Sequence, residues 1–264
     1  MNILVMQWNA IWQDTKANLD KLEKELPYQL NEINNHIDLV VLPEMFHFGF
    51  SMQPERFSES VEGEVSQTLA NMAKQHSINI VAGVAQRKVR LNCHGKQVNF
   101  FNMALAFNFK GEQIGSYAKQ QLFSYANEDK TYTAGYKPEI IDISGEPFAL
   151  FICYDLRFPE LFREVANKVK GFIVLANWPE TRQAHWEALL KARAIENQCF
   201  VIGVNRIGQD GSGLHYNGGS SVVSPQGELL LYANKNTEFS AVEIDLQEVE
   251  EVRKQFPFLK DMKP

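Results

Sequence analysis

The chain has 264 residues, of which 45% are hydrophobic and 22% charged, and its formal net charge is −6. These values are typical of a soluble globular protein. Nucleic-acid binding normally needs a dense basic surface, and no cluster of lysine and arginine here reaches that density. No segment approaches the ~20 apolar residues that span a bilayer. We therefore expect no nucleic-acid or membrane partner, and residence in the cytoplasm.

Neither a linker rich in proline and glycine nor a shift in composition divides the chain, so we expect one domain over residues 1–264. The three cysteines, Cys93, Cys153 and Cys199, are odd in number and widely spaced. Their spacing favours neither a disulfide framework nor a zinc site.

In the first half of the chain, short β-branched runs alternate with helical patterns. We expect strands at 2–8, 37–44 and 78–86, helices at 14–34 and 64–76, and an antiparallel hairpin over 99–119 that turns at Lys110–Gly111. Pro27 is expected to break or kink the first helix, because proline lacks the N–H that an interior position needs.

The second half returns to strand–helix alternation. We expect a strand that ends at Cys153, strands at 171–178, 198–206 and 239–246, helices at 159–168 and 181–197, a hairpin over 215–233 that turns at 225–227, and a polar C-terminal helix. Alternation at both ends with hairpins between them predicts an α/β protein with mixed sheets covered by helices.

The stretch FALFICYDLRFPE carries Cys153 at the end of an apolar run, followed at once by a charged turn. A thiol at such a strand end projects from the turn between the strand and the next helix, where a nucleophile is exposed to a substrate. Free cysteine, however, is most often a small buried hydrophobe. The assignment therefore depends on other residues.

Three more polar residues stand out, and each has an ordinary explanation by itself. Glu44 follows the apolar VVLP, Lys119 ends a strand, and Glu128 lies in a polar loop. Together they supply what a cysteine nucleophile requires: a base for the thiol proton and a cation for the developing oxyanion. Because ligand clefts form at strand ends in α/β folds, the set predicts an acyl-transfer site without histidine.

LPEMFHFGF, then YAKQQLF with NEDKTYTAG, and then CYDLRFPELFREVA occur in this order. Together with AHWEALLKARAIENQCFVIGVNR and GGSSVVSPQGELL, they resemble the nitrilase, or carbon–nitrogen hydrolase, superfamily over essentially the whole chain. The resemblance implies a catalytic triad of Glu44, Lys119 and Cys153, with Glu128 as the second glutamate beside the lysine. It also implies a four-layer α-β-β-α sandwich, commonly paired into a homodimer.

The resemblance further implies a mechanism. Glu44 takes the thiol proton, Cys153 attacks the amide carbonyl, and Lys119 with the backbone N–H of Tyr154 stabilises the oxyanion. Ammonia leaves, and water hydrolyses the thioester. Glu128 orients Lys119 or assists proton transfer. No metal or organic cofactor is needed.

The turn after the nucleophile favours one branch of the superfamily. Nitrile-converting members typically have CWE after the nucleophile, whereas this chain has CYDLRFPE. This difference favours an amidase, and the flanking motifs look most like the ω-amidase branch. Its members hydrolyse the terminal amide of 2-oxo acids such as 2-oxoglutaramate and 2-oxosuccinamate.

Such a substrate is anionic, so we expect compensating donors in the pocket. The candidates for these donors and for the pocket lining are Arg206, His47, His185, Arg182, Trp178 and Phe123. Arg157 is expected instead to form a structural ion pair with nearby acids. His47 stands where bacterial relatives more often have a small polar residue, so a position in the pocket would alter the substrate preference.

Three alternatives stay open at this point. An N-carbamoyl amide hydrolase would use the same triad. A non-catalytic sandwich that only binds partners would have no chemical need for all four of Glu44, Lys119, Glu128 and Cys153. A papain-like Cys–His enzyme would need a histidine partner, and none of the six histidines has a suggestive context.

Overall fold

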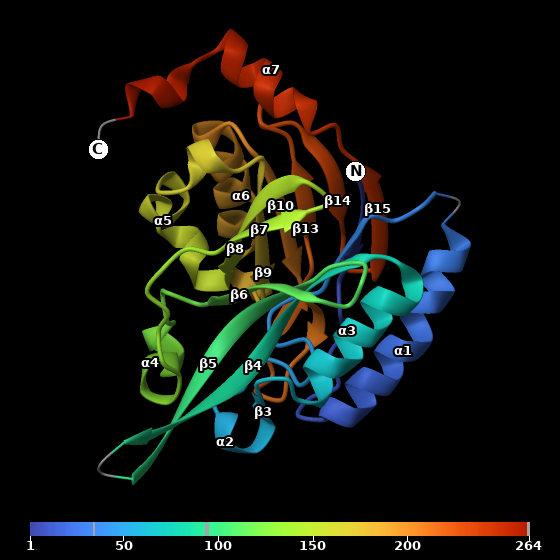
Figure 1. Ribbon diagram of the computed structural model, residues 1–264, viewed down its shortest axis with the longest axis vertical. Coiled ribbons are helices and arrows are strands. Elements are labelled where there is room, and N and C mark those ends of the chain that lie inside the picture. Colours follow the sequence, from blue (N-terminus) through green and yellow to red (C-terminus); the bar gives the residue numbers. More distant parts are fainter. Residues whose placement is uncertain (34, 93–94, 263–264) are drawn as a thin grey trace.

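The computed structural model describes residues 1–33, 35–92 and 95–262. Two mixed β-sheets pack face to face, and helices cover their outer faces (Figure 1). No helix in the described residues is long and apolar enough to cross a membrane.

The first sheet has the strand order β15-β1-β2-β4-β5-β6, and the short β3 also pairs with β4. Its strands are β1 (Asn2–Met6), β2 (Leu39–Val41), β3 (Glu59–Ser60), β4 (Asn79–Asn92), β5 (Gly95–Phe107), β6 (Gln113–Ala118) and β15 (Phe239–Glu243). Strands β1, β2 and β4 run parallel, whereas β15, β5 and β6 join antiparallel.

The second sheet has the strand order β14-β13-β10-β9-β8-β7. Its strands are β7 (Ile140–Ile143), β8 (Glu146–Ile152), β9 (Gly171–Ala176), β10 (Phe200–Asn205), β13 (Ser220–Val223) and β14 (Leu229–Ala233). The three central strands β8, β9 and β10 are parallel. A separate two-stranded ribbon joins β11 (Ile207–Gln209) and β12 (His215–Asn217).

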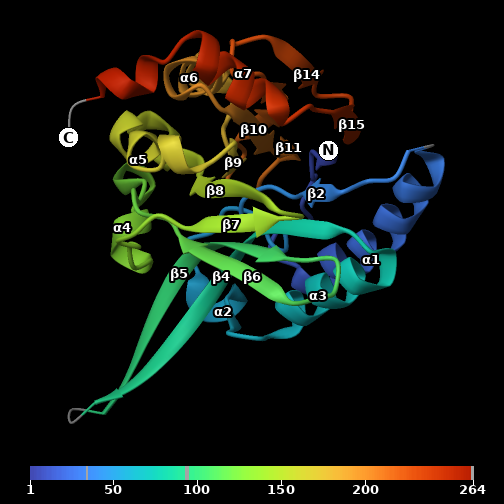
Figure 2. The same cartoon turned by 45° about the horizontal axis from the view of Figure 1, so that its top comes forward.

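The helices lie outside these two sheets (Figures 1 and 2). They are α1 (Thr15–Glu32) and α3 (Glu64–His76) on the first sheet, α5 (Pro159–Arg163) and α6 (Gln183–Asn197) on the second, the short α2 (Pro54–Phe57) and α4 (Glu128–Thr131), and the C-terminal α7 (Gln247–Gln255). Together the elements form the expected four-layer sandwich.

The alternation of side chains along β1 explains the layers. Ile3 and Val5 belong to the apolar core shared with the second sheet, whereas Leu4 and Met6 pack with α1 and α3. Successive residues of a strand point to opposite faces, so a strand that is apolar at every position must be covered on both sides. Here the second sheet covers one face of β1 and the helices α1 and α3 cover the other, which gives the layers of this fold.

Some boundaries differ from those predicted. Helix α1 continues through Pro27 to Glu32, because the apolar face formed by Leu19, Leu22 and Leu26 is buried against the first sheet. The predicted helix end at Asn34 lies outside the described residues. The helix expected at 159–168 ends at Arg163 and is followed by a separate turn.

Several strand features were not predicted. Strands β3 and β11 were missed, and residues 215–217, expected in the hairpin over 215–233, pair with β11 instead. Strand β7 was missed, and the hairpin of β4 and β5 continues well beyond residue 86 and projects from the body (Figure 2). The part of the hairpin beyond residue 86 is mostly polar, and residues 95–98 are exposed, so it lacks the continuous apolar run that marks the buried strands.

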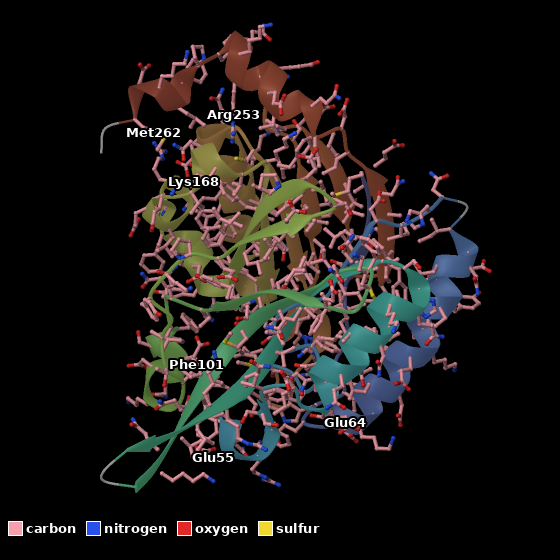
Figure 3. The ribbon with its side chains drawn as sticks, in the orientation of Figure 1. Glu55, Glu64, Phe101, Lys168, Arg253 and Met262 are labelled. Carbon is pink, nitrogen blue, oxygen red and sulfur yellow. The ribbon has the colours of Figure 1, made fainter. Side chains whose placement is uncertain are left out.

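Helix α7 is tied to the second sheet layer by Arg253, whose guanidinium donates to the carbonyls of Ala166 and Val169 (Figure 3). The same group lies 2.8 Å from the sulfur of Cys199. Burial raises the pKa of the Cys199 thiol to about 12. Cys199 is therefore a buried structural thiol.

The segment after β2 lies directly on β4. The N–H of Phe46 donates to the carbonyl of Gly83, and the N–H of Gly83 donates to the carbonyl of Pro43. A Cβ added at Gly83 would lie 2.4 Å from Cα of Glu44. Only glycine therefore permits this approach of the two backbones.

Replacing Gly83 by alanine should force Glu44 away from β4. Overpacking of this kind lowers the free energy of unfolding by about 1–3 kcal/mol, measurable by urea denaturation. Gly83→Val, with two further carbons against the same backbone, should be worse. Equal stability of wild type and Gly83→Ala would contradict the contact.

His47 anchors the same segment from behind, and it does not face a cavity. Its side chain is fully buried, and its Nε2 accepts from the N–H of Ala85 at 3.2 Å, while Nδ1 lies 3.4 Å from Oγ1 of Thr15. Burial lowers the pKa of His47 to about 3. The folded protein therefore holds this imidazole neutral, and the expectation of a substrate donor here is corrected to a structural role.

This burial predicts a specific acid sensitivity. Between pH 6.5 and about 3 the unfolded chain binds a proton at His47 that the folded chain does not, so stability falls as pH decreases through this range. By pH 5 the loss from this group reaches about 2 kcal/mol. His47→Gln, which can still accept from Ala85, should lose less stability than wild type between pH 7 and pH 5 in urea denaturation. The exposed His215→Gln is the control and should keep the wild-type pH dependence.

Candidate active site

Four side chains from distant segments meet where strands of both sheets end. Glu44 follows β2, Lys119 follows β6, Glu128 opens α4, and Cys153 follows β8. All except Cys153 are 0–1% exposed. The structure thus brings together the four residues that the sequence pointed to.

Lys119 is the centre of this group. Its Nζ lies 3.0 Å from Oε1 of Glu44, and 3.1 and 2.9 Å from the two carboxylate oxygens of Glu128. Burial alone would lower the pKa of Lys119, but the carboxylates of Glu128 and Glu44 raise it well above its usual value. The ammonium is therefore a fixed positive charge.

Two asparagines complete the surroundings of Glu44. Nδ2 of Asn102 donates to Oε1 at 2.7 Å, and the backbone N–H and Nδ2 of Asn177 donate to Oε2 at 2.9 and 3.2 Å. With Lys119, four donors surround one carboxylate, which has about four lone-pair positions. One of these donors must yield before Glu44 can accept another proton.

Cys153 occupies a strained elbow. Its φ is 45°, in the left-handed region that non-glycine residues rarely adopt, and Met45, directly after Glu44, has a φ of 47°. Strand β8 ends at Ile152, and a short 3-10 turn over Cys153–Arg157 follows. The turn lifts the thiol from the strand end, as a nucleophile requires.

Asp155 holds the turn after Cys153 to the segment that follows Lys119. Its carboxylate accepts from the N–H of Ile152, the N–H of Gln121 and the hydroxyl of Tyr117, all within 2.8–2.9 Å. Burial raises the pKa of Asp155 to about 6. Asp155 therefore connects the turn after Cys153 to the turn after Lys119.

The resting nucleophile is a thiol. Burial and then the Glu44 carboxylate raise the pKa of Cys153 well above its usual value, and the smaller opposing effect of Lys119 does not compensate. Its Sγ lies 3.8 Å from the carbonyl of Asn177. Activation must therefore come from a base that takes the proton, and not from a standing thiolate.

A cavity of about 590 Å³ opens above Cys153 and Lys119. Its wall includes Phe123, Tyr154 and Trp178, as the sequence predicted. The further residues that line it are Trp12, Gln13, Phe50, Ser51, Met52, Gln53, Tyr125, Ala126, Arg157, Asn177, Pro179, Arg182, Asp210, Ser212, Leu214 and Tyr216. A volume of this size is ample for a small organic substrate.

Arg157 is not the ion-pair partner that the sequence predicted. Its guanidinium lies over the ring of Trp178 at 4.6 Å and within 3.3 Å of Nδ1 of His185. Arg182, on the same wall, lies over the ring of Phe123 at 5.6 Å. Aromatic faces leave the N–H edges of both guanidinium groups available to an anion, because stacking uses only the flat face.

Arg206 and His185 do not line the cavity. Arg206 is 1% exposed, and its Nε and Nη2 donate to the carbonyls of Ile207 and Gln209. It therefore supports the β11–β12 ribbon from behind the cavity wall. His185 is exposed and reaches the site only through Arg157. Cys93 lies outside the described residues.

Sequence reasoning missed Asn102 and Asp155. Asn102 interrupts the apolar strand NFFNMALAF, and Asp155 directly follows the Cys-Tyr pair in a turn. A polar residue inside an apolar strand is an available signal, since it must find partners within the core. The identity of those partners could not be read from the strand itself.

Comparison with known proteins agrees with this geometry. The family model described as carbon-nitrogen hydrolase matches residues 4–254. The chain is 36% identical over 263 residues to the omega-amidase YafV of Escherichia coli K12, covering 99% of this chain and 96% of the relative. It is 31% identical over 264 residues to a 2-oxoglutaramate amidase of Bacillus subtilis, covering 99% and 97%.

A solved structure resembles the fold over its whole length. A CN-hydrolase superfamily protein from Xanthomonas campestris, with an arsenic adduct in its active site, has a TM-score of 0.88 and 30% identity, covering all of this chain and 97% of that one. The chain therefore belongs to the carbon–nitrogen hydrolase family, and it is a hydrolase of carbon–nitrogen bonds.

Proposed function

We propose that the protein is a cysteine amidase that hydrolyses the terminal amide of small 2-oxo acids, with 2-oxoglutaramate and 2-oxosuccinamate as substrates. The products are the dicarboxylic 2-oxo acid and ammonia. The observation that carries the proposal is the juxtaposition of Cys153 with the buried ion cluster of Glu44, Lys119 and Glu128 at the base of a cavity that also holds two arginines.

In the first half-reaction, Glu44 accepts the thiol proton as Sγ of Cys153 bonds to the amide carbon. The carbonyl π electrons move to oxygen, where Lys119 and the N–H of Tyr154 stabilise the negative charge. Glu44 then returns the proton to the amide nitrogen, the carbon–nitrogen bond breaks, and ammonia leaves. The acyl group remains on Cys153 as a thioester.

In the second half-reaction, Glu44 takes a proton from water as the hydroxyl oxygen bonds to the thioester carbon. The tetrahedral intermediate collapses with cleavage of the carbon–sulfur bond. The sulfur recovers a proton from Glu44, and the carboxylic acid leaves. Glu128 holds Lys119 in place throughout.

The arginines of the cavity wall favour an anionic substrate. The arginines with a carboxylate partner among the described residues are Arg163 and Arg193, both paired with Glu196. Arg157 and Arg182 instead lie over aromatic rings and line the cavity. A substrate with a carboxylate and a 2-oxo group offers acceptors that match a guanidinium. The omega-amidase and 2-oxoglutaramate amidase relatives agree with this substrate class.

The nucleophile can be tested with an ammonia-release panel of 2-oxo ω-amides, simple amides, nitriles and carbamoyl compounds. Wild type should release ammonia fastest from 2-oxoglutaramate. Cys153→Ala should lose more than about a thousandfold in kcat/KM, because no other group can form the thioester. The Cys153→Ala loss should appear with every substrate.

Cys199→Ala is the matched control, since this thiol is buried and does not line the cavity, and it should retain the wild-type rate per folded molecule. Release from carbamoyl compounds only would replace the proposal with an N-carbamoyl amide hydrolase. A wild-type protein inactive on every amide would overturn it.

Arg157 and Arg182 can be tested by their effect on charged and neutral substrates. Replacing either by glutamine should raise KM for 2-oxoglutaramate about 10–100-fold with little change in kcat, because a charge-assisted hydrogen bond contributes about 1.5–3 kcal/mol. Neutral aliphatic amides should be hydrolysed as by wild type. Arg163→Gln, which removes a partly exposed arginine elsewhere, is the control. An equal loss of kcat/KM for charged and neutral amides would show that Arg157 and Arg182 do not bind the substrate carboxylate.

We further propose that the protein acts in the cytoplasm as a homodimer, paired through the Cys153 strand and the helix that follows. Size-exclusion chromatography with light scattering tests the assembly. A monomer at working concentration would contradict it.

A further inference from the structure

Asn102 is a buried polar residue that the reaction scheme above does not use. It lies in β5 between apolar neighbours, and its side chain is fully buried. Its backbone carbonyl accepts from the N–H of Lys119 at 2.9 Å. The backbone pairing therefore brings the amide side chain beside the ion cluster.

The side chain of Asn102 joins the two glutamates. Nδ2 donates to Oε1 of Glu44 at 2.7 Å and to Oε1 of Glu128 at 2.9 Å. The same two oxygens accept from Nζ of Lys119 at 3.0 and 3.1 Å. Two carboxylate oxygens are thus bridged twice, once by a cation and once by a neutral amide.

The charges of the cluster do not balance, and the neutral amide adds hydrogen-bond donors without changing the net charge. Two carboxylates share one ammonium, so the buried cluster carries one excess negative charge. Neighbouring carboxylates without enough donors relieve this charge by holding one proton between them. A proton held between Glu44 and Glu128 would remove the base that the thiol needs.

The orientation of the amide agrees with a donor role. Oδ1 of Asn102 is buried and has no hydrogen-bond partner among the described residues. A flipped amide would direct this oxygen at two carboxylates, which would be repulsive. An unsatisfied Oδ1 costs free energy. The two hydrogen bonds from Nδ2 to Glu44 and Glu128 compensate for this cost.

We propose that Asn102 is a positioning residue that keeps Glu44 available as the base, because its N–H groups prevent Glu44 and Glu128 from sharing a proton. The inference rests on the proposed function, in which Glu44 takes the thiol proton.

Other titratable groups face the cluster from the elements around it. Lys119 after β6, Cys153 after β8 and Tyr132 after α4 are these groups. Two more carboxylates act on them electrostatically: Asp155 on Lys119, and Glu55 on Tyr132. Burial raises the pKa of Tyr132 far above neutrality, so its hydroxyl stays protonated. Tyr132 therefore keeps its proton throughout the pH range of the test, and the hydrogen bonds of Asp155 go to Ile152, Gln121 and Tyr117 and not to the two glutamates.

The test compares pH profiles of kcat/KM on 2-oxoglutaramate for wild type, Asn102→Ala and Asn102→Asp. The acid limb should move up by about one pH unit or more in Asn102→Ala, which is a tenfold loss below the limb. It should move further in Asn102→Asp, which adds a third carboxylate. Activity should recover toward wild type at alkaline pH.

Asn79→Ala is the matched control, because Asn79 is a buried asparagine on the neighbouring strand β4 that donates to the carbonyl of Asp38 and to Ser144. It should lose stability without moving the acid limb. A pH-independent loss in the Asn102 variants, or an unmoved limb, would reduce Asn102 to packing and overturn the inference.

Infrared spectra separate this inference from the proposed function, because they need no substrate. In the difference spectrum against wild type near neutral pH, Asn102→Ala should show an additional protonated-carboxyl band, beyond any contribution from Asp155, and Asn102→Ala combined with Glu128→Gln should lose this addition. An inactive wild type would overturn the proposed function. The infrared spectra would still show whether Glu44 and Glu128 share a proton in Asn102→Ala. Absence of the band in Asn102→Ala would overturn the inference.

Discussion

A single buried ammonium organises the centre of this protein. Removing a charged group from water costs several kcal/mol per ion, so Lys119 can be buried only where carboxylates and hydrogen bonds compensate that loss. Glu44 and Glu128 supply the charge, and Asn102 and Asn177 supply further donors to the carboxylate of Glu44. Removing Lys119 would leave two buried carboxylates without a cation, and breaking a buried ion pair in this way costs about 3–5 kcal/mol.

That requirement constrains the surrounding backbone. Glu44 must lie against β4, which is possible because Gly83 has no side chain. Met45 and Cys153 adopt left-handed conformations, and Asp155 holds the turn after Cys153 to Gln121 in the turn after Lys119. Strain of about 1–3 kcal/mol at such residues persists only where packing determines the conformation. Here the tightly packed sheets on either side provide that packing.

Elements with a local signal in the sequence were predicted correctly, whereas the positions of several side chains relative to the cavity were not. The apolar runs identified most of the strands and both sheets' helical covers, while β7, the length of the β4–β5 hairpin and the end of α5 were missed. Glu44, Lys119, Glu128 and Cys153 were placed in one site from motifs in register. His47 and Arg206 were expected at the substrate, but both lie behind the cavity wall, whereas Arg157 lines it.

The local pattern of the sequence determined the mixed strands and helices and the approximate positions of the reactive residues, because alternation and strand ends are local properties of a chain. The four layers were expected only from the resemblance to a known family. Tertiary structure alone decided which polar groups touch. Residues 44, 102, 119, 128, 153 and 177 come from six separate segments, and their contacts depend on how two sheets align. A side chain in one strand carries no record of its partner in another, so the double bridge through Asn102 and the stacked position of Arg157 could be seen only after folding.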